Sequence, residues 1–152
     1  MKSIQLDSPE QPLDKFAIDE FEISLGMTLP GDFIDFYLTC NGGYPPYNYV
    51  AGETYLFAID GFFPIKYGSL TIEQLLRDYR KQGIFFAHKI PFASDPGGNI
   101  FFLSVDPATL HHIYLWESQK APHDPGSYTY VCRSFSHFID ALTNDDDREG
   151  MF

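Results

Sequence analysis

Apolar residues recur at helical spacing in four segments of the chain, and this pattern predicts four helices. The first covers residues 15–25, where Asp14 is placed to cap the first turn. The second begins at Pro30, the third covers residues 69–82, and the fourth covers residues 135–142. The apolar faces of these helices and of the strands between them are expected to form one core: Phe21, Leu25, Phe33, Tyr37, Phe102, Leu115, Phe135, Phe138 and Leu142.

Short runs of aromatic and β-branched residues, each bounded by turn residues, predict the strands. They cover residues 89–93, 100–105, 113–116 and 128–132, and a hairpin or two short strands are expected within residues 53–65. Because the connections between these runs are too short for parallel crossovers, the sheet is expected to be mainly antiparallel. The sequence therefore predicts an α+β fold in which the N-terminal helices, a middle helix and a C-terminal helix cover the sheet.

Nothing in the sequence pattern divides the chain into parts, since it contains no internal repeat and no interdomain linker. Its 152 residues suit one domain of ordinary size with a real core. We therefore expect a single domain over residues 1–152, with an acidic and frayed tail over residues 144–152.

Charge and aromatic content narrow the range of partners. The net charge is −11, and residues 1–35 alone hold eight acids against two bases. Nucleic-acid binding normally requires a basic patch, so this composition argues against a nucleic-acid partner. The acidic excess fits either a solubility surface or the steering of a basic partner. Ten Tyr residues exceed what a core needs, and some are expected at a surface that binds protein.

The compartment is inferred from what the sequence lacks. Met1 and Lys2 are not followed by an apolar segment, so no secretory signal is expected. No apolar run approaches the roughly 18 residues of a membrane-spanning helix. We expect a cytoplasmic protein in which Cys40 and Cys132, whose spacing matches no metal or redox motif, are reduced.

Candidate chemistry is weak throughout the sequence. The five His residues show no zinc-ligand spacing, and the adjacent pair His111 and His112 would point to opposite faces of a strand. The segment 95–99, with its two glycines, precedes a strand pattern instead of a helix, which favours a turn over a phosphate-binding loop. We therefore expect no catalytic residues, no metal and no cofactor.

Several segments together resemble the SUKH superfamily of Smi/Knr-like proteins, and the resemblance extends from Asp14 to Leu142. The segments are Ile18-Asp19-Glu20-Phe21-Glu22, Leu25-Gly26-Met27-Thr28-Leu29-Pro30, Phe33 to Tyr37, Asn41-Gly42-Gly43, Pro91-Phe92-Ala93, Gly97-Gly98-Asn99, Ile113-Tyr114-Leu115-Trp116 and Ser134-Phe135 to Leu142. Most members of this superfamily are immunity proteins of bacterial polymorphic-toxin systems, which bind and neutralise a toxin that is often a nuclease. Some fungal relatives are regulatory interaction proteins, and the superfamily shares no catalytic residues.

The resemblance also implies structural roles for part of the motif. Glu22 is the recurrent acid of the first helix, and Gly26 ends that helix. Leu29 and Pro30 begin the second helix, whose cap and turn are formed by three further residues: Asn41, Gly42 and Gly43. These roles concern how the fold is built and do not identify a partner.

The leading functional hypothesis is an immunity protein that occludes a basic cognate toxin. Acids and aromatics near neighbouring turns are the candidate contacts: Tyr44, Tyr47, Tyr49, Glu53, Asp95, Trp116, Glu117 and Asp124. For the loop that carries the first three tyrosines, folding back onto the core is an equal alternative to facing the partner. A regulatory scaffold protein of the same superfamily is the second hypothesis, and a hydrolase with scattered carboxylates is the third.

Overall fold

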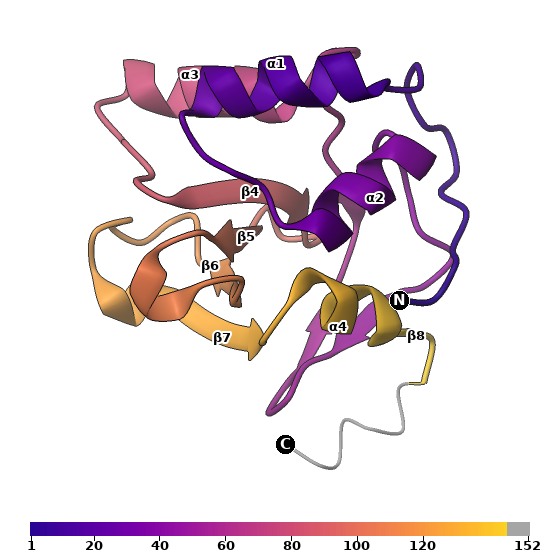
Figure 1. Cartoon of the computed structure of the whole chain (residues 1–152). Helices are drawn as coiled ribbons and strands as arrows, with labels where there is room; N and C mark the ends of the chain where they lie inside the picture. The colour runs from indigo at the N-terminus through magenta and orange to yellow at the C-terminus, as the bar shows by residue number, and fades with distance from the viewer. Residues whose placement is uncertain (146–152) are drawn as a thin grey trace.

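Four α-helices and two antiparallel sheets form an α+β fold over residues 1–145, which the computed structural model describes (Figure 1). The predicted fold class is therefore confirmed. The helices and the two short 3-10 turns are α1 (Lys15–Leu25), α2 (Gly31–Thr39), α3 (Ile72–Lys81), α4 (Phe135–Asp140), η1 (Pro107–Thr109) and η2 (Pro125–Ser127). The first helix has the predicted bounds, and the Asp14 carboxylate accepts a hydrogen bond from the Ala17 N–H at its N-terminus.

The larger sheet has five strands in the order β3-β4-β5-β6-β7, and the smaller has three in the order β2-β1-β8. Every pairing in both sheets is antiparallel. The strands are β1 (Tyr49–Ala51), β2 (Leu56–Ala58), β3 (Gly61–Phe62), β4 (Lys89–Ser94), β5 (Ile100–Ser104), β6 (Ile113–Trp116), β7 (Tyr128–Cys132) and β8 (Leu142–Thr143).

The main core lies between one face of the larger sheet and the helices α2 and α4. Phe138 of α4 is fully buried, and its ring centroid lies 5.0 Å from that of Phe92 and 5.1 Å from that of Phe101. Phe33 of α2 packs edge-on against Phe135 at 5.0 Å. Such edge-to-face pairs join the two helices to the sheet.

A second, smaller core covers the opposite face of the same sheet. Phe102 and Trp116 pack there with Phe86, and Tyr79 of α3 lies edge-on to Trp116 at 5.5 Å. Because side chains alternate between the faces of a strand, Phe102 points away from its neighbour Phe101. The expectation of one shared core is therefore wrong for Phe102, and helices cover both faces of the sheet.

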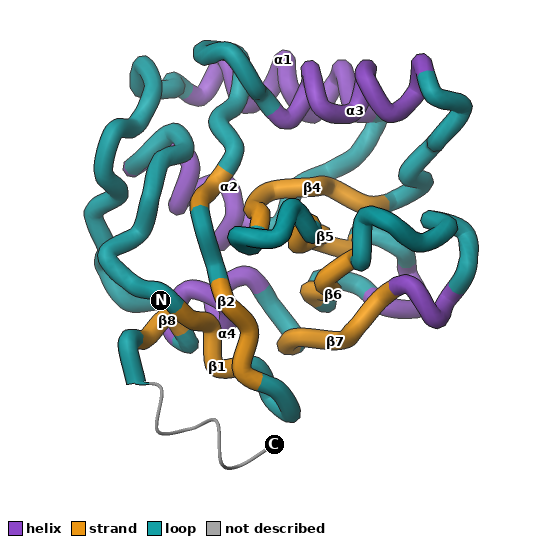
Figure 2. Tube along the Cα trace, turned by 180° about the vertical axis from the view of Figure 1, so that it is seen from behind, coloured by secondary structure: helices purple, strands orange, loops and turns teal. Residues whose placement is uncertain are grey.

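The C-terminal helix is shorter than its apolar periodicity suggests. It ends at Asp140, and Leu142 begins strand β8, where it is buried opposite Val50. The Leu142 carbonyl accepts a hydrogen bond from the Lys2 ammonium at 2.6 Å, so the N-terminal segment lies beside β8 (Figure 2). The missed strand β1 includes Tyr49, which was expected in a loop.

The expected frayed tail falls mainly on residues 146–152, which lie outside the described residues. Asn144 lies within the described residues, and both the oxygen and the nitrogen of its side-chain amide form hydrogen bonds. Its Oδ1 accepts from the Asn48 N–H at 2.8 Å, and its Nδ2 donates to the Pro46 carbonyl at 3.1 Å. At Asn144 the chain is therefore attached to the segment that precedes β1.

The turn between α1 and α2 is built by the motif residues that were expected to shape it. Gly26 has a φ of 66°, and its N–H donates to the Glu22 carbonyl, which ends α1. The Glu22 carboxylate accepts from the Leu29 N–H at 2.7 Å and so fixes the path into the second helix. Pro30 occupies the N-cap of α2, one position before the helix starts at Gly31.

Asn41 is a buried polar residue, 1% exposed, that joins three segments. Its Nδ2 donates to the Gln11 carbonyl at 3.0 Å and to the Ile65 carbonyl at 2.9 Å, and its Oδ1 accepts from the Ile65 N–H at 2.7 Å. The two following glycines have positive φ values. A Cβ on Gly43 would overlap the Asp7 carbonyl oxygen, so only glycine fits there.

The buried position of Phe138 gives a direct stability test. Phe138→Ala should lower the free energy of unfolding by about 3–5 kcal/mol, because it leaves a cavity among packed aromatic rings. Ile23→Ala on α1 is the matched control, since Ile23 is 80% exposed and its truncation should cost within about 0.5 kcal/mol. Denaturant unfolding of both variants measures the difference, and equal midpoints for Phe138→Ala and the parent protein would contradict this packing.

Candidate partner-binding surface

Trp116, one of the candidate partner contacts, is buried. Trp116 is 1% exposed and lies in the smaller core between Phe86 and Tyr79. Its indole N–H has no hydrogen-bond partner within residues 1–145. The expectation that Trp116 contacts a partner is therefore wrong, because α3 covers the sheet face to which it points.

Three of the predicted acids share one end of the larger sheet. The backbone N–H of Asp60 donates to the Ser94 carbonyl at 2.8 Å, which places Asp60 beside the turn at Asp95. On the other side of that turn, the Ser118 N–H donates to Asn99 Oδ1 at 3.2 Å. This contact places the loop over residues 117–127, which carries Glu117 and Asp124, beside the same turn. The five residues Tyr44, Asp60, Asp95, Glu117 and Asp124 are called the acidic edge below.

Tyr44 belongs to the acidic edge through its contact with Gly61. A Cβ on Gly61 would lie 2.9 Å from Tyr44 Cδ1, so the tyrosine ring lies directly over that glycine and next to Asp60. Backbone bonds between Tyr44 and Asp7 fix the segment that carries the ring. The side chain nonetheless remains 54% exposed, which makes Tyr44 the one predicted loop tyrosine with a large accessible surface.

The acids of this edge differ in their local bonding. Asp95 accepts hydrogen bonds from the backbone N–H groups of Gly97 and Asn99 and so builds its own turn. Asp124 caps η2, and Glu117 pairs with Lys120 at 2.8 Å. Asp60 is exposed, and its carboxylate has no bonding partner in the described part of the chain. Asp60 is therefore the acid most available to a partner.

Tyr47, Tyr49 and Glu53 lie elsewhere, around the smaller sheet. The Lys2 ammonium lies 4.4 Å from the Tyr47 ring centroid, and Tyr49 is paired within the sheet between β2 and β8. The Glu53 carboxylate accepts a hydrogen bond from the Tyr130 hydroxyl at 2.9 Å. The structure therefore does not bring all the candidate contacts together on one face.

A second accessible surface was not identified from the sequence. Tyr114 and Tyr130 are cross-strand partners on β6 and β7 with ring centroids 5.7 Å apart, and the His112 ring lies 5.4 Å from that of Tyr130. With Tyr128, these half-buried residues form what we call the tyrosine face, on the side of the sheet that α3 only partly covers. The alternation of Tyr114 with the buried residues Ile113 and Leu115 is the sequence signal that could have revealed it.

Burial keeps the phenols of this face protonated. It raises the pKa of Tyr128 to about 12 and that of Tyr130 to about 12, and the neighbouring Glu53 carboxylate adds to the second shift. The Tyr130 hydroxyl donates to Glu53, and the Tyr128 hydroxyl donates to the Pro122 carbonyl at 2.7 Å. The Tyr128 and Tyr130 phenols are therefore uncharged, and their hydroxyls are already oriented.

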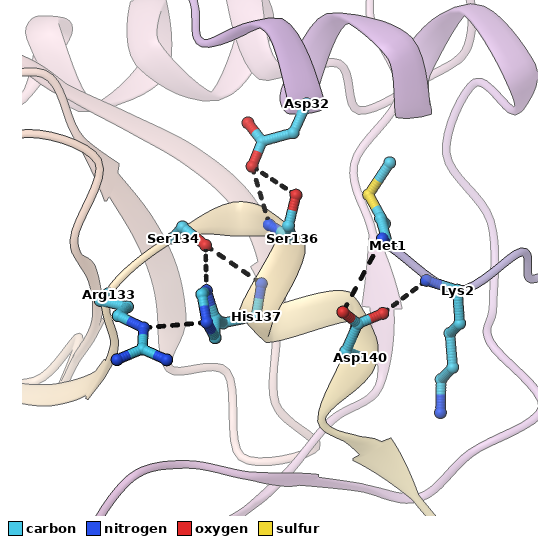
Figure 3. Close-up of polar contacts among 8 residues, drawn as sticks. All are labelled: Met1, Lys2, Asp32, Arg133, Ser134, Ser136, His137 and Asp140. Carbon is cyan, nitrogen blue, oxygen red and sulfur yellow. Dashed lines mark hydrogen bonds and ion pairs between the residues drawn. The ribbon is translucent and has the colours of Figure 1, made fainter.

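A Ser–His contact at the start of α4 has the residue types of a nucleophile pair, but its geometry is that of a helix cap (Figure 3). The Ser134 hydroxyl oxygen accepts from the His137 backbone N–H at 3.1 Å. Arg133 Nε donates to His137 Nε2 at 2.8 Å, so the imidazole carries its proton on Nδ1 and donates it to Ser134. His137 thus cannot accept the serine proton through Nδ1.

Carboxylates hold both ends of the same helix (Figure 3). Asp32 of α2 accepts from the Ser136 N–H at 2.9 Å and from its hydroxyl at 2.8 Å, at the N-terminus of α4. At the other end, Asp140 accepts from the Lys2 backbone N–H and lies 3.8 Å from the Met1 amine. These polar contacts are structural, because they join α4 to α2 and to the N-terminal segment.

Within residues 1–145, no cluster of three His, Cys, Asp or Glu side chains has a geometry that would hold a metal ion. None of the helices in the same range is long and apolar enough to cross a membrane.

The model of the SMI1/KNR4 family (SUKH-1) matches residues 12–141. The chain belongs to this family. The matched range runs from just before α1 to just after α4, so it includes the acidic edge and the tyrosine face. The predicted SUKH resemblance is confirmed. No curated protein matches this SUKH-1 chain.

The raised tyrosine and thiol pKa values predict how stability changes at alkaline pH. Burial also raises the pKa of the Cys132 thiol to about 12. These folded pKa values exceed the values of about 9–10 in an unfolded chain. The protonated groups therefore contribute their full stabilisation of the folded state below about pH 9. Their contribution is lost as the pH rises towards 12. The free energy of unfolding should therefore fall over this window.

The variant Tyr130→Phe removes one of these groups and should make the alkaline fall of stability shallower. Denaturant unfolding at a series of pH values measures the slope for the variant and the parent protein. Identical slopes would show that the Tyr130 phenol is no harder to ionise in the folded protein than in the unfolded chain.

Proposed function

We propose that this SUKH-1 protein is a cytoplasmic, non-catalytic immunity protein that binds a cognate toxin and neutralises it by occlusion. Membership of the family supports the class of function. The observation that carries the choice of surface is the acidic edge, where Tyr44 is 54% exposed beside the unpaired carboxylate of Asp60. The partner is proposed to be basic, as a nuclease toxin would be at the site that binds its phosphate-rich substrate.

The charge of the chain supports a basic partner over a nucleic acid. The net charge of −11 repels phosphate and attracts a basic protein over distances of about one Debye length, roughly 8 Å at physiological salt. The acidic edge concentrates four carboxylates from three separate loops at one end of the sheet. A surface of this kind accelerates association more than it raises final affinity.

Aromatic side chains would supply most of the apolar area in contact with the partner, which the carboxylates cannot supply. Tyr44 extends from a segment whose backbone is bonded to Asp7, so little conformational freedom is lost when a partner covers its ring. The tyrosine face begins at Tyr128, whose hydroxyl is bonded to Pro122 in the same loop that carries Glu117 and Asp124. A partner on the acidic edge can extend onto this face, which helps to reach the roughly 800 Å² per partner of a stable interface.

The groups with potential for chemistry support a non-catalytic role. Ser134 and His137 are occupied as a helix cap. Cys132 is buried, and its raised pKa keeps it a thiol, which is a poor nucleophile. The hydrolase hypothesis would require converging carboxylates, whereas Asp95 and Asp124 form turns and Glu117 is paired with Lys120.

The proposal predicts that Asp60 steers association with the toxin. Binding kinetics against the cognate toxin should show about a twofold to fivefold slower association for Asp60→Asn at low salt, and the difference should shrink at high salt. Asp19→Asn on α1 removes the same charge from an exposed position outside the acidic edge and is the matched control. Tyr44→Ala should instead raise the dissociation rate, with a loss of about 2 kcal/mol if Tyr44 is a hot spot.

The same variants can be tested for function in cells that express the toxin. The parent protein should restore growth, and Tyr44→Ala should restore it only at higher expression. Binding without growth rescue would refute the immunity role and favour the regulatory scaffold alternative. Equal association rates for Asp60→Asn and Asp19→Asn at every salt concentration would refute the acidic edge as the contact surface.

A further inference from the structure

A groove of about 820 Å³ lies between α1, α3 and the segment after α3, outside the acidic edge and the tyrosine face. Figures 1 and 2 show α1 and α3 running side by side above the larger sheet. The apolar part of its wall comes from Leu25, Met27, Leu76, Ile84 and Phe86. Its volume falls in the range of pockets that bind small molecules, so it can take a few side chains of a peptide segment but not a folded domain.

One end of this groove carries basic side chains, opposite in sign to the net charge of the chain. Arg77 and Arg80 lie one turn apart on α3, and His88 lies on the segment that follows. Within residues 1–145 neither arginine makes an ion pair, and Arg77 donates only to the side-chain amide of Gln74, at 2.9 Å. The end of the groove at the C-terminus of α3 therefore presents two guanidinium groups that have no carboxylate partner.

The two acids that line the groove are engaged at its other end. Glu20 pairs with the Lys66 ammonium at 3.6 Å, and the Glu73 carboxylate accepts from the Lys66 backbone N–H at 2.9 Å. Glu73 lies one turn before Arg77 on α3. Because these acids satisfy Lys66, they leave the arginines without a carboxylate partner in a protein that has twice as many acids as bases.

An exposed aromatic ring completes the rim beside the arginines. Phe85 is 69% exposed, and the Arg80 guanidinium lies 5.4 Å from its ring centroid. Cation–π contact of this kind orients the guanidinium while its N–H groups remain available to a carboxylate. Guanidinium groups bind carboxylates through paired hydrogen bonds, which makes them selective for acidic ligands.

We propose that this groove binds an acidic peptide segment of a protein partner. Apolar side chains of the segment contact Met27, Phe86 and their apolar neighbours, while its carboxylates bind Arg77 and Arg80. The proposal does not depend on the toxin, because it concerns a partner of the opposite charge on a different surface. The protein then has two binding surfaces of opposite charge and can hold two partners at once.

The test uses two labelled octapeptides, one alternating glutamate with leucine and one alternating lysine with leucine. Fluorescence anisotropy against the full chain should show saturable binding of the acidic peptide. The protein is itself acidic, so general electrostatic attraction opposes this binding, and the basic peptide reports on the acidic edge instead. No saturable binding of the acidic peptide up to millimolar protein would overturn the proposal.

Paired variants show whether the groove is the binding site. The double variant Arg77→Gln, Arg80→Gln should weaken binding of the acidic peptide by about tenfold or more, because two charge-assisted contacts are lost. The double variant Lys15→Gln, Lys81→Gln removes the same charge from α1 and α3 at exposed positions that do not line the groove. All four side chains are exposed, so both double variants should unfold at the parent temperature. An equal loss of affinity in the two double variants would contradict the assignment.

Discussion

The buried amide of Asn41 is the interaction on which the rest of the structure depends. It satisfies both backbone groups of Ile65 and the carbonyl of Gln11, which belong to segments on either side of the first two helices. Loss of this side chain would leave the buried N–H and carbonyl groups of Ile65 unpaired, each at a cost of about 1–3 kcal/mol. The adjacent Gly42 and Gly43 allow the close approach of Pro64 and Asp7, so the chain reaches Tyr44 and β3 along one fixed path.

The acidic edge follows from that constraint. Because Gly43 is bonded to Phe62 and Tyr44 to Asp7, the ring of Tyr44 lies over Gly61 and beside Asp60. Aromatic packing then decides which other surfaces remain accessible. Helices α2 and α4 fill one face of the sheet, whereas α3 covers only part of the other and leaves the tyrosine face half-buried. The surfaces proposed for binding are those that the core does not use.

Local sequence patterns predicted most of the fold because the relevant interactions are local. The cap at Asp14, the left-handed Gly26 and the turn at Asp95 each depend on residues fewer than five positions apart. Leu142 was misplaced because helical periodicity continues past Asp140, whereas pairing with Val50 turns this segment into a strand. That pairing joins residues far apart in the sequence, and no local pattern encodes it.

The candidate surfaces were less predictable for the same reason. Trp116 is buried because α3 covers its face of the sheet, and the sequence does not show which face a helix covers. Tyr114 and Tyr130 face one another only once β6 and β7 pair. The groove likewise combines Lys66, two arginines of α3 and His88 with residues of α1. The local role of a single residue could be predicted from its neighbours in the sequence. Which residues lie together on one surface could not, because that depends on the fold.

Hydrogen–deuterium exchange of the complex with the toxin tests the central claim, that one partner covers the acidic edge, most directly. Protection on binding should appear in four segments that are separate in the sequence: residues 43–47, 59–61, 94–99 and 117–127. The groove segment over residues 77–88 should exchange at the same rate with and without the toxin. Protection confined to residues 77–88, with none in the four segments of the acidic edge, would contradict the account.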